Sequence, residues 1–189
     1  MSPDTNQPSP SHYTKTAIIL HWLMAVPMVL LLIFGLQTMG GHHDHVWPTI
    51  HVSAGFTLLA LAAFRIFWRL RHPAPPLPVA MSKAARASAQ VSHLALYAAM
   101  ILIPITGWLA FTEHVRRTLG VASASFFGLA RIPILPDFGI NFHLIHKWGG
   151  KAALALIALH VLAALKHHFY DHDDVLHRMI KWNRDAGLK

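Results

Sequence analysis

Four histidines offer the clearest chemistry in this chain: His21, His51, His146 and His160. Each lies in a long apolar stretch, where an ionisable side chain is costly and normally marks a function. A neutral imidazole is a strong ligand for transition metals, including iron. The pattern therefore predicts metal ligands inside a structure that spans a membrane.

The composition supports a membrane location. Hydrophobic residues make up 54% of the 189 positions and charged residues only 13%, which is too apolar for an ordinary soluble domain. The chain contains no cysteine, so disulfides, cysteine-ligated iron-sulfur clusters and haem attached through C-x-x-C-H are excluded. The formal charge of +8 comes from basic residues beside the apolar stretches, so nucleic acid is not an expected partner.

Four apolar stretches are each long enough to cross the hydrocarbon core as a helix. They cover about residues 17–36, 50–68, 92–111 and 144–165, which predicts an all-α, integral membrane four-helix bundle in the lipid bilayer. The loop expected at 72–90 follows a run of arginines and contains no acid, and this bias places it in the cytoplasm. Four spans then put both termini on the cytoplasmic side of the membrane.

The expected organisation has three parts. A flexible N-terminal tail covers residues 1–16, a four-helix transmembrane domain covers 17–170, and a cytoplasmic C-terminal tail covers 171–189. The long segment 112–143 is expected to pack over the outer end of the bundle. The end of the chain is expected to form a short amphipathic surface helix.

Helix geometry sorts the four histidines into two pairs. Fourteen residues separate His146 from His160, which corresponds to about 3.9 turns and about 21 Å, so both lie on nearly one face at opposite depths. His21 matches the depth of His160 near the cytoplasmic side, and His51 matches the depth of His146 near the outer side. Each pair can hold one metal centre, and a porphyrin between the helices would bury its apolar ring there. Iron with two axial imidazoles has no open position, which suits electron transfer.

Arg65 is a further candidate for cofactor binding. It lies fourteen residues after His51, the same spacing as in the fourth span, so it should face the inner site. Our hypothesis is that Arg65 neutralises a propionate of the inner haem.

Four strings in the chain resemble the prokaryotic di-haem cytochrome b561 family: ILHWLMA, IHVSAGFTLLALAAFRIFWRLRHPAPP, SHLALYAAMILIPITG and IHKWGGKAALALIALHVLAALKHHF. The resemblance covers about Lys15 to Tyr170. It implies two non-covalent b haems, one in each leaflet, and electron exchange with a membrane quinone. For the best-understood members it also implies oxidation of superoxide at the periplasmic face with reduction of ubiquinone.

The charge pattern is compatible with an anionic donor such as superoxide. Basic residues outnumber acidic ones near the predicted outer end, where a positive field would steer a small anion toward the outer haem. The basic residues are Arg116, Arg117, Arg131, Lys147 and Lys151, against Asp44, Glu113 and Asp137.

Several alternatives remain at the level of sites. His143 could replace His146 as the outer ligand, and His93 could compete with His21, contact a propionate or lie at the interface. The four histidines could also form hydrogen bonds between helices without metal. The tract with His42, His43 and His45 could bind a surface metal, although a solvated loop is favoured. The same choice applies at the chain's end, where an interfacial role is favoured for His167, His168, His172 and His177 beside Asp171, Asp173 and Asp174.

Two further functions fit the sequence. The chain could be a haem b subunit that relays electrons from quinol to a redox partner protein. It could instead be a haem-free, histidine-lined metal transporter. A low-spin b-type spectrum would dismiss the transporter, and turnover that requires a partner would favour the subunit.

Overall fold

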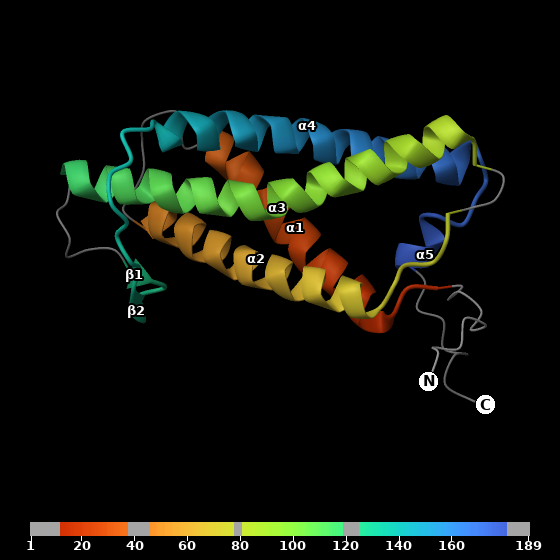
Figure 1. The fold of residues 1–189 in the computed structure, drawn as a ribbon, viewed down its shortest axis with the longest axis horizontal. Helices are drawn as coiled ribbons and strands as arrows, with labels where there is room; N and C mark the ends of the chain where they lie inside the picture. The colour runs from red at the N-terminus through yellow and green to blue at the C-terminus, as the bar shows by residue number, and fades with distance from the viewer. Residues whose placement is uncertain (1–11, 38–45, 78–80, 119–124, 181–189) are drawn as a thin grey trace, which may run out of the picture.

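The computed structural model describes residues 12–37, 46–77, 81–118 and 125–180. Four long helices dominate this part of the chain (Figure 1). They are α1 (Lys15–Gln37), α2 (Val46–Arg71), α3 (Lys83–Thr118) and α4 (Phe142–Phe169). A small hairpin of β1 (Ser125–Phe126) and β2 (Ala130–Arg131) precedes α4, and the short α5 (His177–Ile180) follows it. The tract with His42, His43 and His45 lies outside the described residues.

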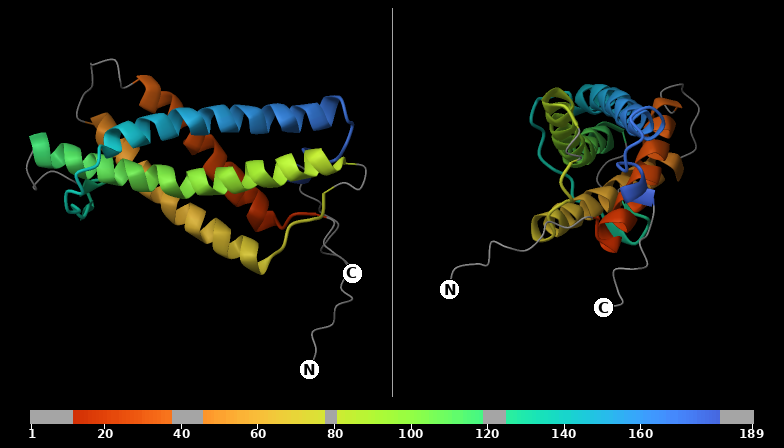
Figure 2. Two further views of the ribbon diagram at one scale, coloured as in Figure 1. Left: turned by 45° about the horizontal axis from the view of Figure 1, so that its top comes forward. Right: turned by 90° about the vertical axis from the view of Figure 1, so that its right-hand side faces the viewer.

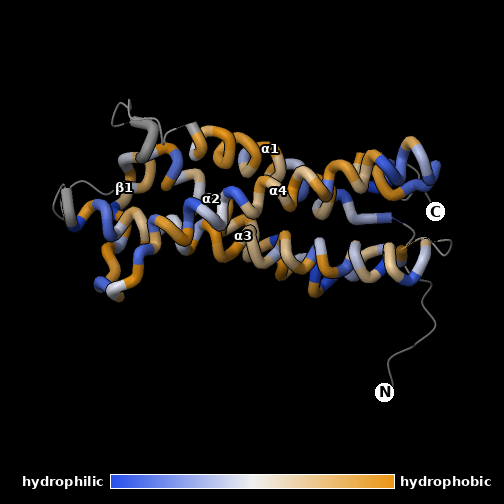
Figure 3. Tube along the Cα trace, turned by 90° about the horizontal axis from the view of Figure 1, so that it is seen from above, coloured by the Kyte–Doolittle hydropathy of each residue, from blue (hydrophilic) through white to orange (hydrophobic). Residues whose placement is uncertain are grey.

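All four long helices are long and apolar enough to cross a membrane, which confirms the expected fold class. Their outward surfaces are apolar: Leu102 on α3 is 57% exposed and Leu162 on α4 is 61% exposed. Hydrophobic residues line the middle of the bundle, whereas hydrophilic ones gather toward its two ends (Figure 3). This distribution suits a bundle whose solvent is lipid.

The helices pack as two pairs that cross each other. α3 runs beside α4, while α1 and α2 lie obliquely to them (Figure 2). Met24, Met28 and Leu32 of α1 form the central core with Leu58 and Ala62 of α2 and Ala153 of α4. The small side chains of Ala62 and Ala153 let backbones approach closely, as is typical of helix contacts in membranes.

The third helix is longer at both ends than the sequence predicted. It begins at Lys83, because the Ser82 hydroxyl accepts a hydrogen bond from the amide of Ala85 and caps the first turn. The prediction of a loop over 72–90 was therefore wrong for residues 83–90, which belong to α3. At the other end α3 continues to Thr118 and carries Glu113 and Arg116 beyond the expected span. Hydropathy marks the part of a helix that lies in lipid, not its polar extensions.

The described part of the chain between α3 and α4, residues 125–141, packs beside the start of α2. Trp108 donates its indole N–H to the carbonyl of Pro133 at 2.9 Å, and Ile132 is buried against Val115 of α3. Asn141 then caps α4 by accepting a hydrogen bond from the amide of Leu144. The described part of this segment therefore packs against the bundle, as expected.

After α4 the chain turns back under the opposite end of the bundle. The indole N–H of Trp22 in α1 donates to the carbonyl of Met179 at 2.8 Å, and Arg178 donates to the carbonyl of Pro76 at 2.9 Å. The only helix among residues 171–180 is the four-residue α5, and the rest of the amphipathic helix expected there lies outside the described residues. The boundary at 170 stays a prediction, and residues 171–180 contact the transmembrane helices.

Candidate functional site

The histidines predicted to pair by depth do face each other. The ring centres of His21 and His160 lie 6.5 Å apart, and those of His51 and His146 lie 6.0 Å apart. We call these the inner pair and the outer pair, after the sides predicted from the charges. All four rings lie between helices and are partly buried.

Both separations suit two imidazoles that share one metal ion. An imidazole nitrogen binds a transition metal at about 2 Å, and a ring nitrogen lies roughly 1 Å from its ring centre. Two rings on opposite sides of one ion therefore have centres about 6 Å apart. The rings of each pair are also steeply inclined to one another, at 61° and 86°. The donor set of both pairs fits a bis-histidine haem.

An apolar cavity of about 210 Å³ adjoins the outer pair. It lies between α1 and α2, and its lining includes the ring of His51. The other lining residues are Pro27, Leu30, Leu31, Phe34, Ile50 and Ala54. Apolar walls beside an imidazole are what the edge of a porphyrin needs, so the surroundings of His51 also fit the group.

The orientation of His146 depends on α3, a helix that carries none of the four paired histidines. The carbonyl oxygen of Ile103 lies 3.0 Å from Nδ1 of His146. A carbonyl oxygen can only accept, so this hydrogen bond requires the proton on Nδ1 and leaves Nε2 free to bind a metal. The hydroxyl of Thr106 donates to the same carbonyl at 2.9 Å and lies 3.4 Å from Nδ1.

Two glycines make room for the outer pair. A Cβ atom at Gly107 of α3 would lie 2.8 Å from Cε1 of His146, closer than real contacts allow. A Cβ atom at Gly35 of α1 would lie 3.4 Å from Cε1 of His51. In the sequence, Gly107 is only a small residue inside an apolar stretch. Nothing in a single sequence shows which ring an intramembrane glycine faces.

Arg65 lies at the depth of the inner pair, as predicted. Its guanidinium donates to the carbonyl of Ala17 at 3.2 Å, lies 3.4 Å from Nδ1 of His21 and lies 5.9 Å from the ring centre of Tyr97. A guanidinium can only donate, so the contact with His21 is a hydrogen bond only when Nδ1 carries no proton. The two pairs therefore differ: a carbonyl faces Nδ1 of His146, and a cation faces Nδ1 of His21.

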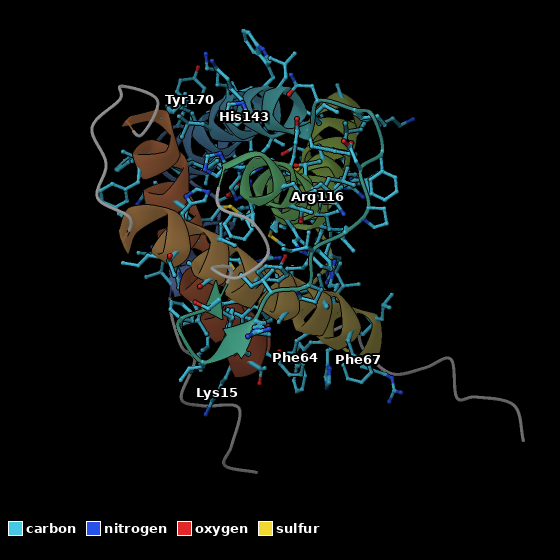
Figure 4. The ribbon with its side chains drawn as sticks, turned by 90° about the vertical axis from the view of Figure 1, so that its left-hand side faces the viewer. Lys15, Phe64, Phe67, Arg116, His143 and Tyr170 are labelled. Atoms are coloured by element: carbon cyan, nitrogen blue, oxygen red, sulfur yellow. The ribbon has the colours of Figure 1, made fainter. Side chains whose placement is uncertain are left out.

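The two alternative histidines lie in different surroundings. His143 is exposed at the outer end of α4, one turn before His146 (Figure 4). The ring centre of His93 lies 5.4 Å from that of His160, so the inner end contains three neighbouring histidines. The sequence leaves three roles open for His93: a competitor of His21, a contact of a haem propionate or an interfacial residue. The structure brings it into contact with the inner pair.

The histidines and acids after α4 form a polar network at the surface. Nδ1 of His167 lies 2.7 Å from a carboxylate oxygen of Asp173 and 3.1 Å from one of Asp171. Lys166 donates to both oxygens of Asp171 at 2.8 and 2.7 Å, and this hydrogen bonding lowers the pKa of Asp171 against the opposing effect of desolvation. The ammonium thus supplies a positive charge to the carboxylate of Asp171, and the choice between a surface metal site and an interfacial role stays a prediction.

A membrane bundle with a pair of facing histidines near each end has the architecture of a haem-binding electron carrier. Comparison with known proteins agrees, because the family model for prokaryotic cytochrome b561 matches residues 12–182. The chain belongs to the prokaryotic cytochrome b561 family. Membership implies haem b binding and electron transfer in the inner membrane, and it rules against the haem-free transporter.

Two relatives extend over almost the whole chain. The protein is 33% identical over 190 residues to cytochrome b561 homolog 2 of Escherichia coli K12, covering 95% of this chain and 97% of the relative. It is 29% identical over 182 residues to the probable superoxide oxidase CybB of Yersinia pestis, covering 91% and 97%. The family predicted from the four strings is confirmed.

Proposed function

We propose that the protein holds two b haems, one between His21 and His160 and the other between His51 and His146, and carries electrons from superoxide to ubiquinone. The observation that supports this most is the pair of ring separations, 6.5 and 6.0 Å, at the two ends of one bundle. The similarity to a probable superoxide oxidase supports the choice of donor. Two superoxide anions would each give one electron and leave as O2, and one ubiquinone would take both electrons and two protons to become ubiquinol.

Different residues of this chain would have different roles in the reaction. Bound haem iron would supply one-electron redox chemistry. The four imidazoles would hold the two haems, and the donor would give its electron without binding to the metal. Ile103 and Thr106 would keep the proton of His146 on Nδ1, and apolar side chains such as Leu31 and Phe34 would exclude water beside His51.

The proposed orientation places the outer pair on the periplasmic side. The basic ends of α2 and α3, with Arg69, Arg71 and Lys83, would then lie in the cytoplasm, as would both termini. Arg116, Arg131, Lys147 and Lys151 would lie at or near the periplasmic end, with Glu113 and Asp137 as the acids among the described residues there. The excess of positive charge would attract superoxide.

A liposome assay tests the proposed function. The purified protein is reconstituted with ubiquinone, superoxide is generated outside, and quinol formation is followed. We expect two haems per chain, a low-spin b spectrum and quinol formation by the protein alone. Turnover that begins only after a redox partner protein is added would favour the quinol-oxidising subunit instead.

The outer cations should make the superoxide reaction sensitive to salt. Raising the ionic strength from about 10 to about 150 mM shortens the Debye length from about 30 to about 8 Å. We expect the second-order rate with superoxide to fall by about two- to fivefold. At low salt, Lys151→Gln should lower this rate by up to about twofold, whereas Lys83→Gln at the opposite end should leave it unchanged. A rate that does not depend on salt would contradict steering.

Loss of the Arg65 cation should lower the reduction potential of the inner haem. A positive charge near the propionates stabilises the reduced haem relative to the oxidised one, because oxidation adds a positive charge to the iron. We expect Arg65→Met to lower one of the two potentials by on the order of 50–100 mV and Arg65→Lys to lower it less. A redox titration followed at the b-type absorption band measures both potentials. Two unchanged potentials in Arg65→Met would refute the role of Arg65.

A further inference from the structure

The hairpin between α3 and α4 lies against the side of the bundle. In Figures 1 and 4 it is seen beside α2, near the end where α2 begins. Its two strands pair Ser125 with Arg131 and Phe126 with Ala130. The backbone amide of Phe127 donates to the hydroxyl of Ser53 in α2 at 2.9 Å, and Ser53 is completely buried. The hairpin is therefore attached to a transmembrane helix at a defined position.

The base and the tip of the hairpin face different surroundings. At the base, Phe126 contacts the ring of Phe56 with centres 6.5 Å apart, and Ile132 is buried. At the tip, Phe127 is 47% exposed and Leu129 is 85% exposed. Phe127 also has a positive φ of 47°, which is uncommon for a bulky residue and costs of order 1 kcal/mol or more. The fold thus holds two apolar side chains away from the protein's own core.

The position of Ser53 along α2 indicates the depth at which the hairpin lies relative to a membrane. The apolar part of α2 begins at Thr49, and Ser53 comes four residues later, about 6 Å along the helix axis. The candidate span of 23 residues, which ends with Arg69 and Arg71, would measure about 34 Å, slightly more than the hydrocarbon thickness of about 30 Å. Ser53 therefore lies near the level where acyl chains meet the headgroups.

We propose that the tip, residues 127–129, inserts into the outer-leaflet interface of the bilayer and anchors the start of α2. Lipid suits this surface because the tip is attached to the side of α2 near the level of the headgroups, and apolar groups typically enter an interface by about 5–10 Å. Arg131 at the base is exposed and can reach lipid phosphates. Two side chains present far less than the roughly 800 Å² per partner of a stable protein interface, which argues against a second copy.

The absence of cysteine from the chain allows a direct test with a single spin label. The full-length holoprotein with Leu129→Cys is labelled with a nitroxide and reconstituted in phosphatidylcholine and phosphatidylglycerol vesicles. Power saturation then compares collisions with oxygen, which enters the bilayer, and with a water-soluble nickel chelate. Leu102→Cys, 57% exposed in the middle of α3, reports the membrane interior, and Asp174→Cys, with a side chain 80% exposed outside the spans, reports water.

We expect the ratio of the collision rate with oxygen to that with nickel to be at least threefold higher for the label at position 129 than for the label at position 174. Its value should lie between those of the two control positions, as expected at an interface. Nickel access equal to that at position 174 would overturn the proposal. Spin–spin broadening that vanishes on dilution with unlabelled protein would also overturn it, because a second copy would then cover the tip. The test does not depend on the electron donor or acceptor, so its failure would leave the proposed electron transfer standing.

Discussion

Replacing His146 with alanine should remove the outer haem and leave the inner one in place. Haem content measured by the pyridine method is expected to fall from two per chain to one, and superoxide-driven quinol formation should fall by at least about a hundredfold because the outer redox site is lost. His143→Ala is the matched control, since this neighbouring histidine is exposed and lies one turn away on the same helix. It should keep both haems and most of the activity.

The reverse result would reassign the outer ligand. One haem in His143→Ala and two in His146→Ala would show that the 6.0 Å separation between His51 and His146 does not mark the ligating pair. The same comparison applies at the inner end. There, His160→Ala should lose the inner haem, whereas His93→Ala should keep it and change only its spectrum or potential.

Alanine at Gly107 should displace the same outer ligand, His146, by direct steric contact. The added Cβ would lie 2.8 Å from Cε1 and 3.1 Å from Nδ1 of His146, so the ring or the helix has to move by several tenths of an ångström. The hydrogen bond to Ile103 confines the ring on the same side, and ligand geometry tolerates errors of only about 0.5 Å. We expect loss of most of the outer haem, or a potential of that haem shifted by more than about 50 mV.

Gly55→Ala separates this steric effect from the general effect of alanine in a helix. A Cβ atom at Gly55 of α2 meets nothing within 4 Å, so this variant should keep two haems and normal potentials. Both substitutions favour the helix by roughly 0.5–1 kcal/mol, so neither should unfold the bundle. Unaltered haem content and potentials in Gly107→Ala would show that His146 is not held against this glycine when haem is bound.

The two pairs also differ in the position of the imidazole proton that their contacts require. If His21 binds iron through Nε2, its proton has to move to Nδ1, and the 3.4 Å contact from Arg65 can no longer be a hydrogen bond. Arg65 would then be free to pair with a carboxylate. This follows from the proposed ligation and agrees with the role predicted for Arg65, which the redox titration of Arg65→Met tests.

The sequence alone was sufficient for the four spans, the family and the matched depths of the histidines in each pair. Hydropathy depends on local composition, and the rise of a helix is constant, so the depth of His21, His51, His146 and His160 can be counted along the chain. The polar ends of α3 were missed because Lys83 and Arg116 carry no hydropathy signal, although they continue the same helix.

Contacts between helices were decided only by the tertiary structure. Counting residues does not show that His93 faces His160, that Gly107 faces His146, or that the amide of Phe127 reaches Ser53. These neighbours depend on the angles at which helices cross and on how side chains interlock, and each is a property of two surfaces together. Depth is set within one helix and can be read from its sequence, whereas facing partners are set by packing.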